Sequence, residues 1–356
     1  MVQQTHKRDH YSRKGRNDIM KKICIIGGMN FSIISEVDGK LQDDNSVCGN
    51  IHTRFGGVAY NIASVISEYE GVQIDYMTIL SRDMIGKLAE TILKEHGISY
   101  KNSLYLDNWA SYYSDICSRN FHYGINDMKI VDMIDQSFIN TRKQEILKND
   151  ILIIDENISA DVLEYIVDNI DIPIYCEATS PLKCKRISSR INNIYAIKFN
   201  KKEFCEFYSA DDSIFENDKT ILETVKNRCA ELTFVTLGEK GSFCISNQKI
   251  YSCQTVNIIN AVNTLQAGDS FFGGVIVKLL SGEDIPSSLE YGTLCAEKRL
   301  RANNPNNDIL SDETIKKLDN ISSGLKDIDT VYNICPKQNF SCLRCSGSSG
   351  RYIYDK

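Results

Sequence analysis

The stretch IYAIKFNKKEFCEFYS, residues 194–209, joins a run of apolar and β-branched residues directly to an amphipathic run. A short apolar run followed by a longer run with helical spacing is typical of a buried strand and the helix after it. The same pairing recurs along the chain after residue 22. This alternation predicts an α/β fold with a doubly wound, mostly parallel sheet and helices on both faces.

The remaining elements follow the same pattern. Further predicted strands begin at residues 23, 74, 151, 172, 232 and 242. Predicted helices cover residues 58–69, 84–96, 160–170, 201–209, 219–230, 269–281, 287–301 and 311–325. Two stretches, about 31–55 and 103–128, instead alternate polar and aromatic residues with no helix after them. They predict a small antiparallel β lid with one buried face, above the carboxyl ends of the strands, where open α/β sheets bind ligands.

The composition is that of a globular protein. Of 356 residues, 42% are hydrophobic and 25% are charged, and the net charge of −6 gives no general attraction to nucleic acid or anionic membranes. The N-terminus has no apolar core of a signal peptide. The 13 cysteines are scattered among apolar segments, which favours a reduced, cytoplasmic setting over a disulfide framework.

Both ends of the chain differ from its centre. Residues 1–20 are polar and basic, which predicts a disordered tail, and residues 331–356 end in a Gly/Ser-rich run that predicts a loosely ordered one. Cys335, Cys342 and Cys345 lie in the second tail, but a second pair at metal-site spacing is missing, so we favour coincidence over a zinc site. One domain is expected over residues 21–330.

The stretch QAGDSFFGG, residues 266–274, places small residues and an acid at the start of an apolar helix. As a purely structural feature, Asp269 would be the N-cap of that helix. Small residues there also let backbone N–H groups converge on an anion, helped by the helix dipole. In that interpretation Asp269 takes a proton from an alcohol, while the N–H groups stabilise charge on a transferred phosphoryl group.

Two further turns suit a nucleotide. TLGEKGS, residues 236–242, puts Thr236, Gly238 and Gly241 after a strand, where backbone can approach a nucleotide or simply turn a hairpin. NKKEF, residues 200–204, sets Asn200 and Glu203 on one face of a helix start. They suit either a hydrated Mg²⁺ near phosphates or a capping box.

A third turn, FGGVAYN at residues 55–61, suits a sugar. Gly56 and Gly57 precede a helix that carries Asn61, so the segment is either a glycine helix start or a site for a hydroxyl group.

In this order the segments resemble the motifs of the ribokinase-like, or PfkB-type, sugar kinases. These are a GG after a lid strand, an N-x-x-E after a central strand, a TLGEKG turn and an x-A-G-D at a helix start. The resemblance covers roughly residues 21–325. Within the family, the pseudouridine kinases are most similar, on the strings IGGMNFSI, FGGVAYNIA, INDMKI, DENIS, TSPLKC and NPNND.

The resemblance implies phosphoryl transfer from Mg·ATP to the ribose 5′-hydroxyl of pseudouridine, K⁺ near the anion hole, and a homodimer through the lid. Asp269 is the implied base, in an anion hole formed by residues 266–269: Gln266, Ala267, Gly268 and Asp269. The implied nucleotide residues are Asn200, Glu203, Thr236, Gly238 and Gly241, with Glu203 holding Mg²⁺ through water. The implied substrate residues are Asn30, Ser32, Gly56, Gly57, Asn61, Asn126, Asp127 and Lys183.

Some positions depart from the family pattern. Gln266 replaces the usual Gly, so we expect its side chain to narrow the anion hole and Gln266→Gly to raise the rate or leave it unchanged. Ser32 replaces an acid, and Glu177 with Ala178 replaces Asp-Pro. These changes keep two alternatives open: a kinase for another nucleoside or sugar, such as adenosine or ribose, or a catalytically weak, nucleoside-binding regulatory protein.

Overall fold

The computed structural model describes residues 20–41, 44–107, 110–118, 121–255 and 264–303. Both predicted tails lie outside these residues, apart from Met20 at the edge of the first, and so do the predicted helix at 311–325, the NPNND string, Cys335, Cys342 and Cys345. No helix among the described residues is both long and apolar enough to cross a membrane.

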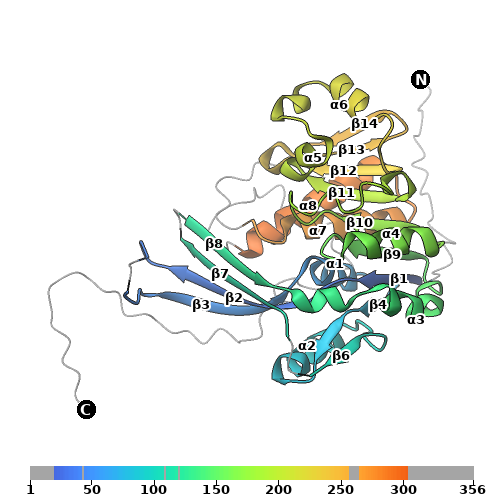
Figure 1. Ribbon diagram of the computed structural model, residues 1–356. Coiled ribbons are helices and arrows are strands. Elements are labelled where there is room, and N and C mark those ends of the chain that lie inside the picture. The colour runs from blue at the N-terminus through green and yellow to red at the C-terminus, as the bar shows by residue number, and fades with distance from the viewer. Residues whose placement is uncertain (1–19, 42–43, 108–109, 119–120, 256–263, 304–356) are drawn as a thin grey trace, which may run out of the picture.

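An eight-stranded sheet forms the centre of the molecule, in the order β14-β13-β12-β11-β10-β9-β1-β4 (Figure 1). The six strands from β12 to β4 run parallel, and β13 and β14 add an antiparallel hairpin at one edge. The bounds are β1 Lys21–Ile26, β4 Val72–Met77, β9 Ile151–Asp155, β10 Ile174–Glu177, β11 Ala196–Asn200, β12 Leu232–Thr236, β13 Ser242–Ser246 and β14 Lys249–Cys253.

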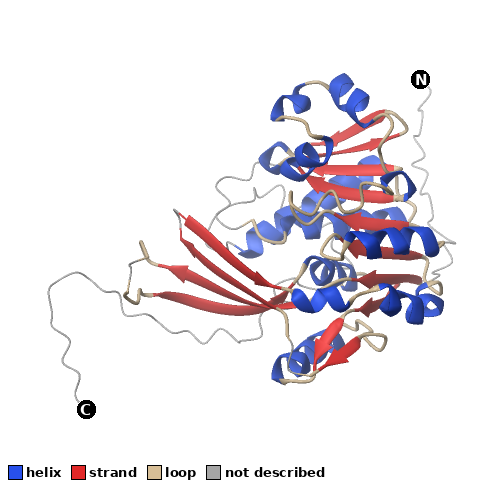
Figure 2. Cartoon of the chain, in the orientation of Figure 1, coloured by secondary structure: helices blue, strands red, loops and turns tan. Residues whose placement is uncertain are grey.

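Helices cover both faces of this sheet, as the alternation predicts (Figure 2). Successive strand residues point to opposite faces, so Leu152 and Ile154 of β9 join one hydrophobic core while Ile151 and Ile153 join the other. The first core contains residues of α3 Gln136–Ile146, α4 Ala160–Asn169, α5 Lys201–Tyr208 and α6 Asp218–Val225. The second contains residues of α1 Val58–Ser67, α2 Met84–Glu95, α7 Ala267–Leu280 and α8 Ile285–Asn303.

The lid is a separate four-stranded sheet in the order β3-β2-β7-β8, and Figure 1 shows it projecting from the main sheet. Its strands are β2 Asn30–Val37, β3 Gly49–Gly56, β7 Tyr112–Ser118 and β8 Phe121–Asp127. Each predicted segment folds into one antiparallel hairpin, and the two hairpins join through a parallel β2–β7 pair.

Several boundaries differ from the sequence prediction. The predicted strand from residue 74 divides in two, because β5 Ile79–Ser81 leaves the main sheet and pairs with β6 Leu104–Leu106. The lid's second hairpin therefore begins at Tyr112 rather than near residue 103. Helix α3 and strand β14 were not predicted. The helix has little amphipathic contrast in its sequence QSFINTRKQEI, and the strand is only partly buried.

The topology of the sheet indicates a candidate site at the carboxyl ends of the parallel strands. The strand order reverses at β1, which has β4 on one side and β9 on the other, and open α/β sheets bind ligands outside such a reversal.

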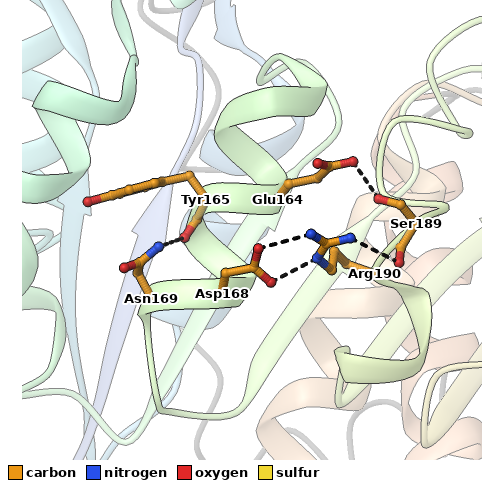
Figure 3. Close-up of polar contacts among 6 residues, drawn as sticks. All are labelled: Glu164, Tyr165, Asp168, Asn169, Ser189 and Arg190. Atoms are coloured by element: carbon orange, nitrogen blue, oxygen red, sulfur yellow. Dashed lines mark hydrogen bonds and ion pairs between the residues drawn. The ribbon is translucent and has the colours of Figure 1, made fainter.

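The segment that follows β10 is held against the surface of α4 by side-chain contacts. Arg190 donates to both carboxylate oxygens of Asp168, at 2.8 and 3.0 Å, and Ser189 donates to Glu164 (Figure 3).

Candidate active site

Asp269 lies inside the first turn of α7 and is not its N-cap. The helix begins at Ala267, earlier than predicted, and its N-cap is Gln266, which has a left-handed φ of 66° and makes no side-chain cap bond. The Asp269 carboxylate instead accepts a hydrogen bond of 2.6 Å from Nδ2 of Asn61. The capping explanation of this acid is therefore wrong, and its side chain is held by a neighbouring helix.

Asn61 sits one turn into α1, where its backbone N–H donates to the carbonyl of Gly57 at 2.8 Å. The side chain is buried, and its Oδ1 accepts a hydrogen bond of 2.9 Å from Nε2 of Gln266. Gln266, Asn61 and Asp269 thus form a chain of side-chain hydrogen bonds, which we call the amide chain. A close contact between α1 and α7 supports it, since a Cβ at Gly273 would come within 2.9 Å of Val65 Cγ1.

Lys198 of β11 is a site residue that the sequence analysis missed. A Cβ built on Gly268 would lie 2.7 Å from Lys198 Nζ, so the ammonium group lies against the predicted anion hole. Lys198 donates to Glu177, its register partner on β10, and the side chains are only 5% and 2% exposed. The available signal was a charged residue inside a fully apolar strand, two positions before Asn200.

The charges around Lys198 favour its cationic form. Burial lowers the pKa of Lys198, but Glu177, Glu203 and Asp269 outweigh that effect and hold the pKa above its ordinary value. Partial burial raises the pKa of Asp269, while Lys198 and the hydrogen bond from Asn61 oppose the rise. The site thus combines one fixed cation with a carboxylate that remains partly accessible to solvent.

Asn200 and Glu203 form the capping box that starts α5. The Asn200 side chain accepts from the Glu203 N–H at 2.9 Å, and Glu203 Oε2 accepts from the Asn200 N–H at 2.7 Å. Glu203 is also buried. Burial raises its pKa above the ordinary value, although the charge of neighbouring Lys198 opposes the rise. A carboxylate with one oxygen engaged keeps further lone pairs, so the capping role and a role near a hydrated ion are compatible.

The predicted nucleotide residues lie at the same edge of the sheet. Thr236 ends β12 and is in register with Asn200. Gly238 has a φ of 63° and nothing within 4 Å of a built Cβ, which leaves its backbone open to a ligand. Gly241 is different: a Cβ there would lie 2.1 Å from the Cys253 carbonyl, so the turn into β13 alone requires this glycine.

Four of the predicted substrate residues converge where the lid meets α1. Cβ atoms built on Gly56 and Gly57 would each lie 3.3 Å from Asn30 Oδ1, and the one on Gly56 also 3.1 Å from Ser32 Oγ. Asn30 Oδ1 is buried and has no hydrogen-bond partner within the described part of the chain. The two glycines therefore leave room beside an unpaired acceptor, which suits a hydroxyl donor.

The lid has a polar face and an apolar face. Arg54, Ser32, Tyr113 and Asn126 are cross-strand neighbours in one row of the polar face, which we call the polar row. Asp127 follows Asn126 on β8 and lies on the opposite face, because neighbouring strand residues alternate. Asn126 and Asp127 are thus not brought together.

The polar row includes charge that was not predicted. Arg54 lies in the row itself, and its charge lowers the pKa of Asp269, so the lid and the start of α7 are electrostatically coupled. Asp115 is buried two residues after Tyr113 on β7, on the same face as Ser32. The acid that is missing at position 32 is thus matched by an acid on the neighbouring strand, which was not predicted.

Lys183 contacts the end of β9 and not the start of α7. Its Nζ donates to Asn157 Oδ1 at 2.7 Å, and burial lowers its pKa. Asp155, the last residue of β9, accepts from the N–H of Ala59 at 3.2 Å and is fully buried. Burial raises the pKa of Asp155 to about 6. These groups line the point where the strand order reverses.

Comparisons with known proteins identify sugar and nucleoside kinases as relatives of this chain. The chain is 24% identical over 295 residues to the pseudouridine kinase of Escherichia coli (strain K12), covering 81% of this chain and 93% of that protein. It is 21% identical over 305 residues to the uncharacterized sugar kinase YeiI of the same organism, covering 84% of each.

The fold has close counterparts among solved structures. The ribokinase of Arabidopsis thaliana, in complex with ribose and ATP, superposes with a TM-score of 0.66 over 78% of this chain and 91% of that one, at 15% identity. A model of the pfkB family of carbohydrate kinases matches residues 20–311, so the chain belongs to this family of enzymes, which transfer a phosphoryl group to a hydroxyl acceptor.

Proposed function

We propose that the protein is an ATP-dependent nucleoside kinase that phosphorylates the ribose 5′-hydroxyl of pseudouridine, giving pseudouridine 5′-phosphate and ADP. The observation that carries the proposal is the start of α7. There Asp269 is oriented by Asn61, and the Lys198 ammonium lies against Gly268. The similarity to the pseudouridine kinase of Escherichia coli supports the choice of substrate.

In this proposal Asp269 is the general base. Asn61 engages Oδ2 of the carboxylate, and the other oxygen, which accepts no hydrogen bond from the described residues, is proposed to accept the proton of the attacking hydroxyl group. The N–H groups at the start of α7 and the Lys198 ammonium stabilise the negative charge on the transferred phosphoryl group. Both groups are fixed by the fold before substrate arrives, so they need little reorganisation during the reaction.

The nucleotide is proposed to lie along Asn200, Thr236 and Gly238. No cluster of three or more His, Cys, Asp or Glu side chains among the described residues is arranged to hold a metal. Glu203, through water, is the residue that would hold a Mg²⁺ ion carried by the phosphates. Such an ion supplies charge neutralisation between the phosphates. A K⁺ site near the anion hole stays a prediction, and residues 256–263 before it lie outside the described residues.

The substrate is proposed to lie between the lid and α1. Asn30, Ser32 and Gly57 face the ribose, and Asn126 in the polar row faces the edge of the base. Asp127, on the opposite face, contributes no direct contact in this arrangement. Because the cysteines within the described residues are unpaired and several are buried, we propose the cytoplasm as the setting.

A homodimer through the lid is also part of the proposal. The apolar face carries four exposed side chains, Ile51, Tyr112, Tyr123 and Ile125, which are 70%, 39%, 60% and 66% exposed. Cross-strand pairing puts them on the same face. Exposed apolar groups gathered on one sheet face are typical of a protein interface.

The test is ADP release from Mg·ATP with pseudouridine, uridine, adenosine and ribose in parallel. We expect turnover selective for pseudouridine. Asp269→Asn is expected to lower kcat by a factor of about 10² to 10⁴ while ATP still binds, because the amide cannot accept the proton. Preference for another acceptor would replace the proposed substrate. Nucleoside binding without turnover on any acceptor would instead favour a regulatory protein with this fold.

A further inference from the structure

Gln266 has a backbone conformation that disfavours residues other than glycine. Its φ of 66° lies in the left-handed region, which glycine adopts freely and other residues adopt at a cost of about 1 kcal/mol or more. Its side chain forms no cap for α7. The amide instead extends to Asn61, 205 positions away in the chain. The contact with Asn61 is therefore the interaction that can offset the backbone cost.

The Asp269 carboxylate determines which atoms donate and which accept along the amide chain. An ionised Asp269 carboxylate can only accept hydrogen bonds, so Asn61 must turn its Nδ2 toward it. That leaves Asn61 Oδ1 facing Gln266, which must donate with Nε2. The remaining amide oxygen, Gln266 Oε1, is buried without a hydrogen-bond partner within the described part of the chain. Reversing either amide would place oxygen against oxygen and lose a hydrogen bond.

We propose that Gln266 is a positioning residue: its amide locks the Asn61 side chain in the one orientation that presents a donor to Asp269. The inference rests on the proposed function of Asp269 as the base. It also reverses the expectation from sequence that glycine at 266 would leave the rate unchanged or raise it. Glycine widens the anion hole but frees Asn61 to rotate, and a free amide spends less time donating to the carboxylate.

The charged groups that face Asp269 come from several elements. Lys198 of β11, Arg299 of α8 and Arg54 of β3 lower its pKa, and Glu177 of β10 and Glu203 of α5 carry like charge. None of them changes when Gln266 is replaced. A difference in the titration of Asp269 between wild type and Gln266→Gly therefore reports the amide chain itself, whereas Gln266→Glu also adds a negative charge to the chain.

The experiment compares Gln266→Gly and Gln266→Glu with Gln248→Gly. Gln248 has a similar left-handed φ of 59° but is exposed in the β13–β14 turn, at the opposite end of β12 from Asp269. It controls for the backbone effect of a glycine at such a position. Glycine adopts this φ without strain, and Glu has nearly the shape of Gln but cannot donate to Asn61 Oδ1 when ionised.

The first measurement is the pKa of Asp269 in the free protein, from the ¹³C resonance of its carboxyl group in aspartate-labelled samples. The signal that disappears in Asp269→Asn identifies it. We expect Gln266→Gly to raise this pKa and Gln248→Gly to leave it unchanged, because only the first weakens the bond that favours the carboxylate. Equal pKa values in wild type and Gln266→Gly would overturn the proposal.

The second measurement is steady-state kinetics with the acceptor that the substrate panel selects. Loss of one hydrogen bond predicts a fall in kcat of about three- to tenfold for Gln266→Gly, with a larger fall for Gln266→Glu. KM for ATP should stay within about twofold, because Gln266 does not hold the nucleotide. A kcat at or above wild type in Gln266→Gly would refute the role. If wild type shows no turnover at all, the proposed function fails, and the titration still decides whether the amide chain holds Asp269.

Discussion

Gly268→Ala tests whether the Lys198 ammonium and the start of α7 form the phosphoryl site. The added Cβ would lie 2.7 Å from Lys198 Nζ, which is 0.7 Å inside the 3.4 Å at which ordinary Cβ contacts begin. Lys198 is buried and bonded to Glu177, so either the ammonium or the first turn of α7 must move by a comparable amount. A misplacement of about 1 Å in an active site costs roughly a hundredfold in rate. We therefore expect kcat to fall by about 30- to 100-fold.

Stability should respond differently from activity. Alanine is favoured over glycine in a helix by up to about 1 kcal/mol, which offsets part of the crowding, so the melting temperature should change little. The matched control is Gly274→Ala on the same helix. Its Cβ would also lie 2.7 Å from a neighbour, but that neighbour is Cys295 Sγ of α8, away from the site. Overpacking there costs about 1–3 kcal/mol, from which the same gain in helix propensity is subtracted, and kcat should stay within about threefold of wild type.

The assay is ADP release under saturating ATP and acceptor, together with thermal unfolding of both variants. If Gly268→Ala keeps kcat within about threefold of wild type while remaining folded, the space beside Lys198 Nζ is not where the phosphoryl group passes. The roles given to Gly268 and Lys198 would then be wrong.

Two further predictions concern the buried acids and the lid. Glu156 is buried, and its Oε2 has no hydrogen-bond partner within the described residues. Burial raises its pKa to about 9. The folded state therefore keeps a proton that the unfolded state loses above about pH 4.3. Stability from this group falls as pH rises, so Glu156→Gln should raise the melting temperature relative to wild type by roughly 6 °C more at pH 8 than at pH 5. Exposed Glu283→Gln should show no such difference, and a pH-independent gain in Glu156→Gln would contradict the titration. Ile125→Glu should convert the proposed dimer to a monomer, measured by sedimentation at micromolar concentration. The control Leu182→Glu, at a 96% exposed position outside the lid, should leave the dimer intact. A wild-type protein that is already monomeric would contradict the lid dimer.

Local pattern was enough to predict the framework. The apolar runs of β9, β10 and β11 and the amphipathic helices after them could be identified because burial on both faces leaves a continuous apolar strand. The start of α5 was also located, since capping residues mark a helix start, whereas α7 begins two residues earlier than predicted. Period-two alternation would even have separated Asn126 from Asp127, had it been applied to β8.

What escaped prediction depends on contacts between distant segments. The bond from Gln266 to Asn61 joins residues 205 positions apart, and no local pattern indicates which side chain an amide will meet. Lys198 could be recognised as unusual within β11 but not as a neighbour of Gly268. The parallel β2–β7 pairing likewise follows from how two hairpins dock, which turn chemistry and alternation do not determine.

That docking also has a consequence for how the enzyme is assembled. Phe31 pairs with Tyr112 across the lid, and α1, β4 and α2 all lie between them in the chain. Contacts of such long range form slowly, because closing the intervening loop costs entropy before the contacts form. The polar row, which spans both hairpins, is therefore expected to form after the β1–α1–β4 unit has compacted. In refolding, recovery of activity should lag behind recovery of helical signal, with the lid as the last part to acquire its native pairing.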